Sequence, residues 1–348
     1  MIEHIHGNLY KLQIQLPRNP LKWLNSYVIL SHPRNLIIDT GFDQPECLEA
    51  LLGGIRELGV DMSKTDVLAT HLHADHSGLI SKIISANSKV YMGRIDGAIL
   101  MESIYNFDKY WALKENRFHQ EGYPEKEMTE TGFSNPSRNF ASKKMFEINS
   151  LDDGNTISYG GFDWHVILTP GHTPGHICLY EQQQKILITG DHLLFDITPN
   201  ITWWKESVDS LGDYLASLNK ISHLEVKMTL TAHRENKGIF HERIKELFEH
   251  HKNRLNEVLE IVRKNEHISA YDIAAKMKWS IQADSWADFP PAQRWFAVGE
   301  AIAHINYLVL AEKLQVHNRH NINTYTLRYP LDYLTTEALK KKLAKKDL

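Results

Sequence analysis

Four side chains that can bind metal ions lie within six residues of this sequence. The segment is His71-Leu72-His73-Ala74-Asp75-His76, which offers three imidazoles and one carboxylate. Imidazole nitrogens and carboxylate oxygens are ligands for borderline and hard cations. In one loop, His71 and His73 can converge on one ion, while Asp75 and His76 point toward a neighbouring ion. The segment therefore predicts a loop that serves two metal ions.

Completing two coordination spheres requires ligands from elsewhere, and three later residues are candidates. His172, Asp191 and His233 each follow a short apolar stretch that is typical of a buried strand. The nearby His176 and His192 are interpreted differently, His176 as structural and His192 as a pocket or outer-shell residue that could compete as a ligand.

The elements that position these residues can be predicted from hydrophobic periodicity. An apolar strand over 65–70 leads directly into His71, and a helix is expected over 77–85. Another strand ends at Asp39, which we interpret as the outer-shell carboxylate that orients a ligand imidazole. Between residues 94 and 146 the β pattern gives way to an aromatic-rich helical insertion, whose aromatic residues are interpreted as packing rather than as substrate contacts.

The order of these motifs resembles the metallo-β-lactamase superfamily, and the resemblance covers about residues 1–240. It implies an α/β fold, a four-layer αββα sandwich, with a C-terminal α-helical, winged-helix-like domain. It also implies a ligand for every position of a two-metal centre. The first metal would be held by His71, His73 and His172, and the second by Asp75, His76 and His233, with Asp191 bridging them. The sequence departs from the family at Arg234, where a glycine is usual after the late histidine, and this indicates a modified rim.

Two domains are expected. Residues 1–240 would form the catalytic domain, with the helical insertion at about 94–146, and residues 241–348 the winged-helix-like domain, predicted as three helices and a hairpin. The polar residues of its third helix carry little positive charge, which does not favour DNA recognition. The preferred interpretation is that this domain docks on the catalytic domain, shapes its cleft or mediates formation of a homodimer.

The resemblance implies a binuclear metal-dependent hydrolase that uses a metal-activated water. Asp75 is the catalytic candidate, because its second carboxylate oxygen could orient the nucleophile and pass on a proton. The expected cofactors are two divalent metal ions, zinc first, with iron or manganese as alternatives. We expect a small ester-like substrate, a thioester as in glyoxalase II relatives or a lactone. The alternative is a phosphodiesterase or ribonuclease, since winged-helix-bearing relatives include RNA-cleaving members.

Composition narrows these choices. The 348 residues carry a formal net charge of −4, so no overall positive field would attract nucleic acid or an anionic membrane. The basic stretch from Lys340 to Lys346 is interpreted as a solvated tail. Cys47 and Cys178 cannot form a disulfide framework, and no export signal or membrane-spanning run is evident, so a cytoplasmic location is expected. The missing signal disfavours β-lactam hydrolysis, and the intact histidine motif disfavours an oxygen-reducing flavodiiron protein.

Overall fold

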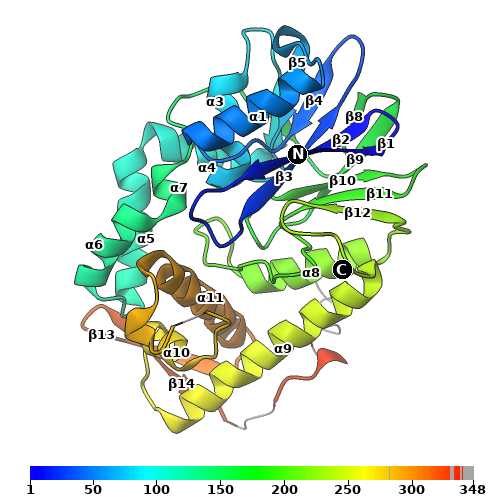
Figure 1. Ribbon diagram of the computed structural model, residues 1–348. Coiled ribbons are helices and arrows are strands. Elements are labelled where there is room, and N and C mark those ends of the chain that lie inside the picture. The colour runs from blue at the N-terminus through cyan, green and yellow to red at the C-terminus, as the bar shows by residue number, and fades with distance from the viewer. Residues whose placement is uncertain (282, 330–332, 338, 340–348) are drawn as a thin grey trace. The chain divides into compact units, whose positions relative to one another are not determined.

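The computed structural model describes residues 1–281, 283–329, 333–337 and 339, and these pack as two compact units (Figure 1). The first unit consists of Met1–Phe107, Pro136–Pro199 and Leu224–Phe240. The second consists of Asp108–Asn135, Asn200–His223 and the chain from His241 onward. The basic stretch from Lys340 to Lys346 lies outside the described residues.

The first sheet belongs to the first unit and follows the order of the chain. Its strands are β1 (Ile2–His6), β2 (Leu9–Gln15), β3 (Trp23–Ile29), β4 (Asn35–Ile38), β5 (Thr65–Leu68), β6 (Val90–Gly93) and β7 (Asn149–Leu151). The strands from β1 to β4 pair antiparallel, and those from β4 to β7 pair parallel. Of the parallel strands, β4, β5 and β6 are short and largely buried, as expected inside such a sheet, whereas β7 at its edge is partly exposed.

The second sheet has the order β12-β11-β10-β9-β8. Its strands are β8 (Thr156–Tyr159), β9 (Phe162–Leu168), β10 (Ile177–Glu181), β11 (Ile186–Gly190) and β12 (Met228–Thr231). β10 and β11 pair antiparallel and form a hairpin. β11 and β12 pair parallel, and the connection between them contains α8 (Ser210–Ser222).

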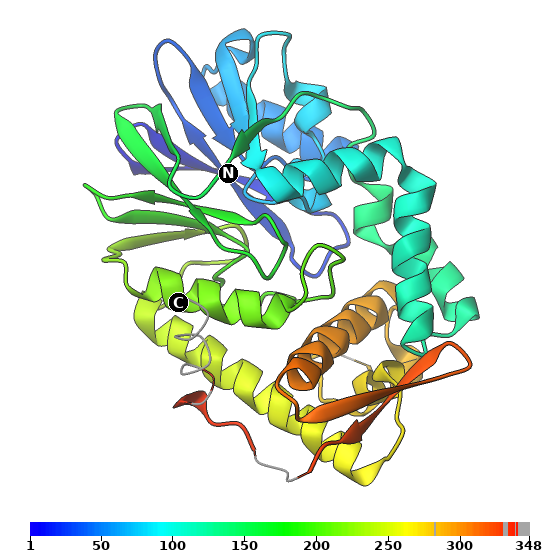
Figure 2. The same cartoon turned by 180° about the vertical axis from the view of Figure 1, so that it is seen from behind.

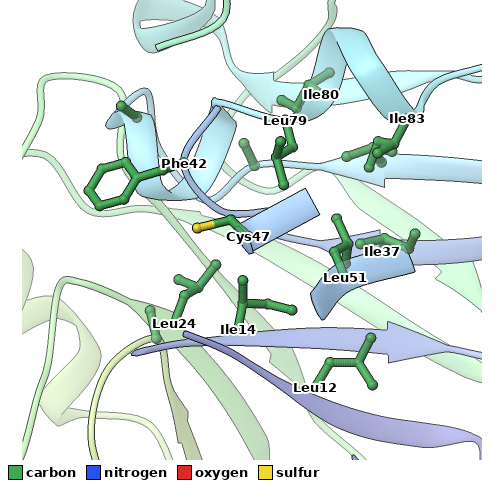
Figure 3. Packing of buried hydrophobic residues seen from close by; sticks show 14 of the residues in the cluster. Leu12, Ile14, Leu24, Ile37, Phe42, Cys47, Leu51, Leu79, Ile80 and Ile83 are labelled. Atoms are coloured by element: carbon green, nitrogen blue, oxygen red, sulfur yellow. The ribbon is translucent and has the colours of Figure 1, made fainter. Parts of the chain in front are cut away.

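Two apolar layers hold the first unit together. Between the sheets, side chains such as Ile38 and Leu68 from the first sheet join Trp164 and Leu179 from the second in one buried cluster. On the other face of the first sheet lie α1 (Pro45–Glu57), α2 (Ala74–Ser77) and α3 (Ile80–Ile83). Figure 3 shows Cys47 and Leu51 of α1 pointing into this second cluster. The α/β sandwich predicted from the sequence is confirmed.

The helix expected over 77–85 is interrupted. The Leu79 amide donates to the Gly41 carbonyl at 3.2 Å, which diverts the chain between α2 and α3. A Cβ atom at Gly78 would lie 2.4 Å from the Ala74 carbonyl oxygen and 2.6 Å from that of Phe140. Only glycine fits this crossing, and the crossing places Asp75 and His76 on a helical turn rather than in a loop.

The predicted insertion is helical. It contains α4 (Arg94–Tyr105), α5 (Phe107–Gln120), α6 (Glu125–Ser134) and α7 (Pro136–Asn139). Two of its aromatic residues, Phe118 and Tyr123, pack on Trp295 with ring centroids 3.6 and 5.7 Å away. These rings serve packing, as the sequence indicated, and they explain why residues 108–135 belong to the second unit.

The second unit also has the predicted order of three helices and a hairpin, which Figure 2 shows from behind. The elements are α9 (Phe240–Lys264), α10 (Ala270–Lys276), α11 (Pro291–Leu310), β13 (Leu314–Arg319) and β14 (Ile322–Leu327). His320 and Asn321 have φ angles of 51° and 65°, the left-handed pair that a two-residue hairpin turn favours. On α11, Arg294 is buried and paired with Glu127, so it is not presented to a ligand.

In the part of the chain that the structure describes, no helix combines the length and the apolar character needed to cross a membrane.

Two fully buried histidines link α9 and α11. His304 Nδ1 donates to the Glu300 carbonyl at 2.8 Å, which leaves its Nε2 to accept from His251 Nδ1 at 3.1 Å. His251 Nε2 is buried without a hydrogen-bond partner among the described residues. Burial lowers the pKa of His304 to about 3 and holds the pKa of His251 well below its ordinary value. Both rings are therefore neutral in the folded unit.

This pair predicts an acid-sensitive second unit. Below pH about 6.5 the unfolded chain protonates both rings, while the folded chain does not until the pH approaches the lowered pKa values. The free energy of unfolding is thus at its full value above pH about 6.5. It falls as the pH decreases, by up to about 1.4 kcal/mol per pH unit for each ring. In His304→Gln, whose amide oxygen can still accept from His251, the slope should decrease by about that amount. Denaturant titrations followed by circular dichroism across this range would measure it, and an equally steep slope in the variant would contradict it.

Candidate metal centre

The structure brings all seven predicted ligands together in the first unit. His71 follows β5, His172 follows β9, Asp191 follows β11 and His233 follows β12, so each candidate lies just beyond the carboxyl end of its strand. Asp75 and His76 are placed by the short helix α2. His71, His76 and His233 are fully buried, whereas His73 is only half-buried. The centre is an enclosed set of side chains with His73 nearest to solvent.

Three imidazoles form the first group. His73 Nδ1 lies 3.0 Å from His71 Nε2 and 2.9 Å from His172 Nε2. A tetrahedral zinc ion with metal–nitrogen bonds of about 2.0–2.1 Å would hold neighbouring nitrogens about 3.3 Å apart. The spacing of these nitrogens is close to that value, and they form one of the sets within the described residues that could hold a metal ion.

Asp75, His76 and His233 form the second group. The Asp75 Oδ2 atom lies 3.2 Å from His233 Nε2 and 3.7 Å from His76 Nε2. This group combines two imidazoles with one carboxylate and is a second candidate metal-binding set. Its donors suit zinc, iron or manganese.

Asp191 lies between the two groups. Its Oδ2 is 3.6 Å from His172 Nε2, in the first group. Its Oδ1 is 3.4 Å from His233 Nε2 and 3.6 Å from His76 Nε2, in the second. One carboxylate therefore offers an oxygen to each group, as a bridging ligand must.

The hydrogen bonds of the second group fit a metal site. His76 Nδ1 is bonded to Asp39 at 2.8 Å, and His233 Nδ1 to the Trp23 carbonyl at 2.8 Å. These bonds fix the tautomers of the neutral rings, in which Nδ1 carries the proton and Nε2 the lone pair. Both Nε2 atoms and Asp191 Oδ1 are buried without a hydrogen-bond partner among the described residues. With both rings neutral, the two Nε2 atoms and Asp191 Oδ1 present three buried lone pairs to one another, an arrangement that suits a bound cation.

The electrostatics of the centre differ between its two groups. Burial lowers the pKa of His71, and the neighbouring imidazoles lower it further, which keeps this ring neutral. Burial also opposes a charge on His76, but the carboxylates around it, Asp39 first, outweigh burial and raise its pKa to about 10. Burial alone would raise the pKa of Asp75, yet His76 and His233 bring it below its ordinary value. A bound cation would take the place of the proton that these carboxylates attract.

Asp39 supports the centre as the sequence predicted for it. Besides the bond to His76, its carboxylate accepts from the Thr70 amide at 2.8 Å and from the Thr70 hydroxyl at 2.9 Å. Thr70 Oγ1 in turn lies 3.1 Å from His71 Nδ1. One carboxylate thus orients a ligand of the second group directly and a ligand of the first group through Thr70.

The start of β3 holds the loop of His233 through main-chain contacts that the sequence did not reveal. The Trp23 carbonyl accepts from His233, and the Asn25 side chain donates to the carbonyls of Thr231 and Arg234, each at 3.0 Å. The Tyr27 hydroxyl donates to the Thr231 carbonyl at 2.7 Å. No motif signals such bonds, because most of their acceptors are peptide carbonyls.

His176 and His192, which were not predicted to be ligands, lie beside the candidate ligands. The His176 Nε2 atom accepts from the Asp191 amide at 3.2 Å, and its Nδ1 is 2.8 Å from Thr169 Oγ1. His176 therefore helps to hold the main chain at Asp191. The buried His192 ring lies 6.0 Å from the His176 ring, and neither belongs to the candidate metal-binding sets found among the described residues.

Two further residues distinguish the centre. Asp96, at the start of α4, is fully buried and accepts hydrogen bonds from both the 71–76 loop and the 172–176 loop. Sequence reasoning missed it, because a lone aspartate in a helical insertion carries no motif. Arg234 has a φ of 63° and lies with its guanidinium 5.7 Å from the centroid of the Trp23 ring. Arg234 is partly buried directly after His233, and the modified rim stays a prediction.

A family model described as the metallo-beta-lactamase superfamily matches residues 24–233, more than half of the chain. The chain belongs to this superfamily. The match runs from the start of β3 to the late histidine, and so it spans all seven predicted ligands. The αββα class predicted from the sequence is thereby confirmed.

Individual relatives agree with the superfamily. A metallo-beta-lactamase family protein of Thermus thermophilus has the same fold, with a TM-score of 0.79 and 24% identity over 93% of this chain and 100% of that chain. A beta-lactamase-like protein 2 homolog of Caenorhabditis elegans is 24% identical over 77% of this chain and 74% of its own length. An atrochrysone carboxyl ACP thioesterase of Emericella nidulans is 23% identical over 63% of this chain and 53% of its own length.

The support from Asp39 predicts the effect of an isosteric change. In Asp39→Asn, either orientation of the amide places an NH₂ group against His76 Nδ1–H or against the Thr70 amide. One buried donor then loses its acceptor, and the affinity for metal should decrease by about 10–100-fold. Competition with a chromophoric chelator would measure this change, and an unaltered affinity would show that Asp39 does not orient the ligands.

Proposed function

We propose that this protein is a binuclear metal-dependent hydrolase that acts on a small ester-like substrate, a thioester or a lactone. The observation that carries the proposal is the pair of ligand groups joined by Asp191, with buried lone pairs facing one another. Superfamily membership supports a metal-dependent hydrolase independently of this geometry.

His71, His73 and His172 would hold one ion, and Asp75, His76 and His233 the other, with Asp191 shared between them. When bound, two divalent ions lower the pKa of water and polarise the scissile carbonyl. Zinc is the first candidate, because histidine-rich sets with a carboxylate suit it, while iron and manganese accept the same donors.

The residues of the chain itself would orient the groups and move the proton. Asp75 is buried, and the neighbouring imidazoles keep it ionised. Its Oδ2 faces His233, so its other carboxylate oxygen is the one we assign to orienting the attacking water and passing a proton to the leaving group. The half-buried His73 marks the side from which a substrate would approach.

The choice of substrate class rests on two supports. The Emericella nidulans relative is named a thioesterase, and we extend acyl-thioester or related acyl chemistry to this chain. The net charge of −4 provides no overall attraction for a polyanion such as RNA.

A hydrolysis panel on the zinc-loaded protein tests the proposal. S-acyl thioesters and acyl lactones should be hydrolysed, and phosphodiesters and RNA should not. Removal of zinc by a chelator should abolish turnover, and addition of zinc should restore it. Cleavage of RNA alone, without activity on acyl compounds, would reverse the assignment of the substrate class.

The ligand assignment predicts a strong effect at His71. Loss of a direct ligand should cost more than the roughly 10–100-fold that loss of an outer partner costs, so His71→Ala should lower kcat by more than about a hundredfold. His165→Ala is the matched control, because this β9 histidine bonds to Thr156 instead of a ligand. Equal rates for His71→Ala and the unaltered protein would remove the proposed centre.

A further inference from the structure

We propose that Asp96 is a positioning residue that sets the metal affinity of the first group, His71, His73 and His172. The inference rests on the proposed metal centre and adds to it a residue from outside the ligand motifs. Asp96 lies in the first turn of α4, and its side chain is fully buried.

Asp96 joins the two loops that supply the first group. Its Oδ2 accepts from the Leu72 amide at 2.9 Å, between His71 and His73. The same oxygen accepts from the Thr173 hydroxyl at 2.6 Å, next to His172. Its Oδ1 accepts from the Gly175 amide at 2.5 Å. Three hydrogen bonds to one buried carboxyl group fix one loop relative to the other.

The backbone around Asp96 is built for this approach. A Cβ atom at Gly175 would lie 2.3 Å from the Asp96 amide nitrogen and 2.8 Å from its Oδ1. A Cβ atom at Gly93 would lie 2.0 Å from the Gly175 carbonyl oxygen. Both positions need glycine because the start of α4 and the 172–176 loop are in direct contact.

The second group has different anchors. The His76 carbonyl accepts from the amide and from the hydroxyl of Thr40, each at 2.8 Å, and its ring is held by Asp39. His233 is held by the Trp23 carbonyl. Loss of Asp96 should therefore affect the first group selectively.

Asp96→Asn tests this inference in the full chain. In either orientation the amide places an NH₂ group against the Leu72 amide or the Gly175 amide, and one of these buried donors loses its acceptor. Stepwise zinc dissociation constants, from chelator competition, should show one site weakened by about 10–100-fold and the other changed by less than about twofold. In a His172→Ala background, which already lacks the first site, Asp96→Asn should not alter the remaining constant.

Asp66→Asn is the matched control. Asp66 is also buried and holds Arg34, the Lys89 amide and the Tyr159 hydroxyl, none of which is a ligand neighbour. It should lower thermal stability and leave both zinc constants unchanged. Thr173→Val removes one of the three hydrogen bonds while keeping the carboxylate, so it should weaken the same site to a smaller extent. This variant replaces Asp96→Asn in the test if Asp96→Asn fails to fold.

The outcomes separate the two proposals. Two unchanged zinc constants in Asp96→Asn, an equal weakening of both sites, or the same change in Asp66→Asn would overturn the role of Asp96 while leaving the metal centre intact. Failure of the unaltered protein to bind two zinc ions would overturn the centre itself, and with it this inference.

Discussion

The central constraint on this structure is a cluster of buried acceptor atoms that have no hydrogen-bond donor. His76 Nε2, His233 Nε2 and Asp191 Oδ1 face one another without a donor among the described residues. Buried acceptors of this kind are costly unless something positive satisfies them. A folded chain that keeps them there would gain by binding a cation, and under the proposed function metal binding would be coupled to folding of the loops.

The fold offsets this cost through contacts with residues outside the loops, which hold the loops in place. His71, His172, Asp191 and His233 each follow a strand whose apolar side chains hold it in the core between or above the sheets. Buried carboxylates then bind the loops to one another, Asp39 at His76 and Asp96 across the 71–76 and 172–176 loops. The late histidine is held by β3, the strand at which the family match begins. The ligands are thus fixed by the sandwich rather than by their own segment.

The candidate ligands could be predicted to lie together because they have a local pattern. The six-residue segment at His71, and the short apolar strands before His172, Asp191 and His233, can be read along the chain, and the structure brings these residues together. Sequence reasoning did not reach Asp96 or the Trp23 carbonyl, since these contacts join distant segments through main-chain atoms. It also missed β1 and the helical turn of α2, and it could not show that Phe118 in the insertion stacks on Trp295 far along the chain. Periodicity describes single elements, whereas these features depend on pairs of elements.

The most direct test of the central claim is a crystal structure of the zinc-loaded protein with anomalous scattering recorded at the zinc edge. We expect two peaks per chain, one among His71, His73 and His172 and one among Asp75, His76 and His233, with Asp191 between them. Two peaks about 3.5–4 Å apart would also match the spacing of two-metal hydrolytic sites. A map in saturating zinc with no peak at these side chains would contradict the account.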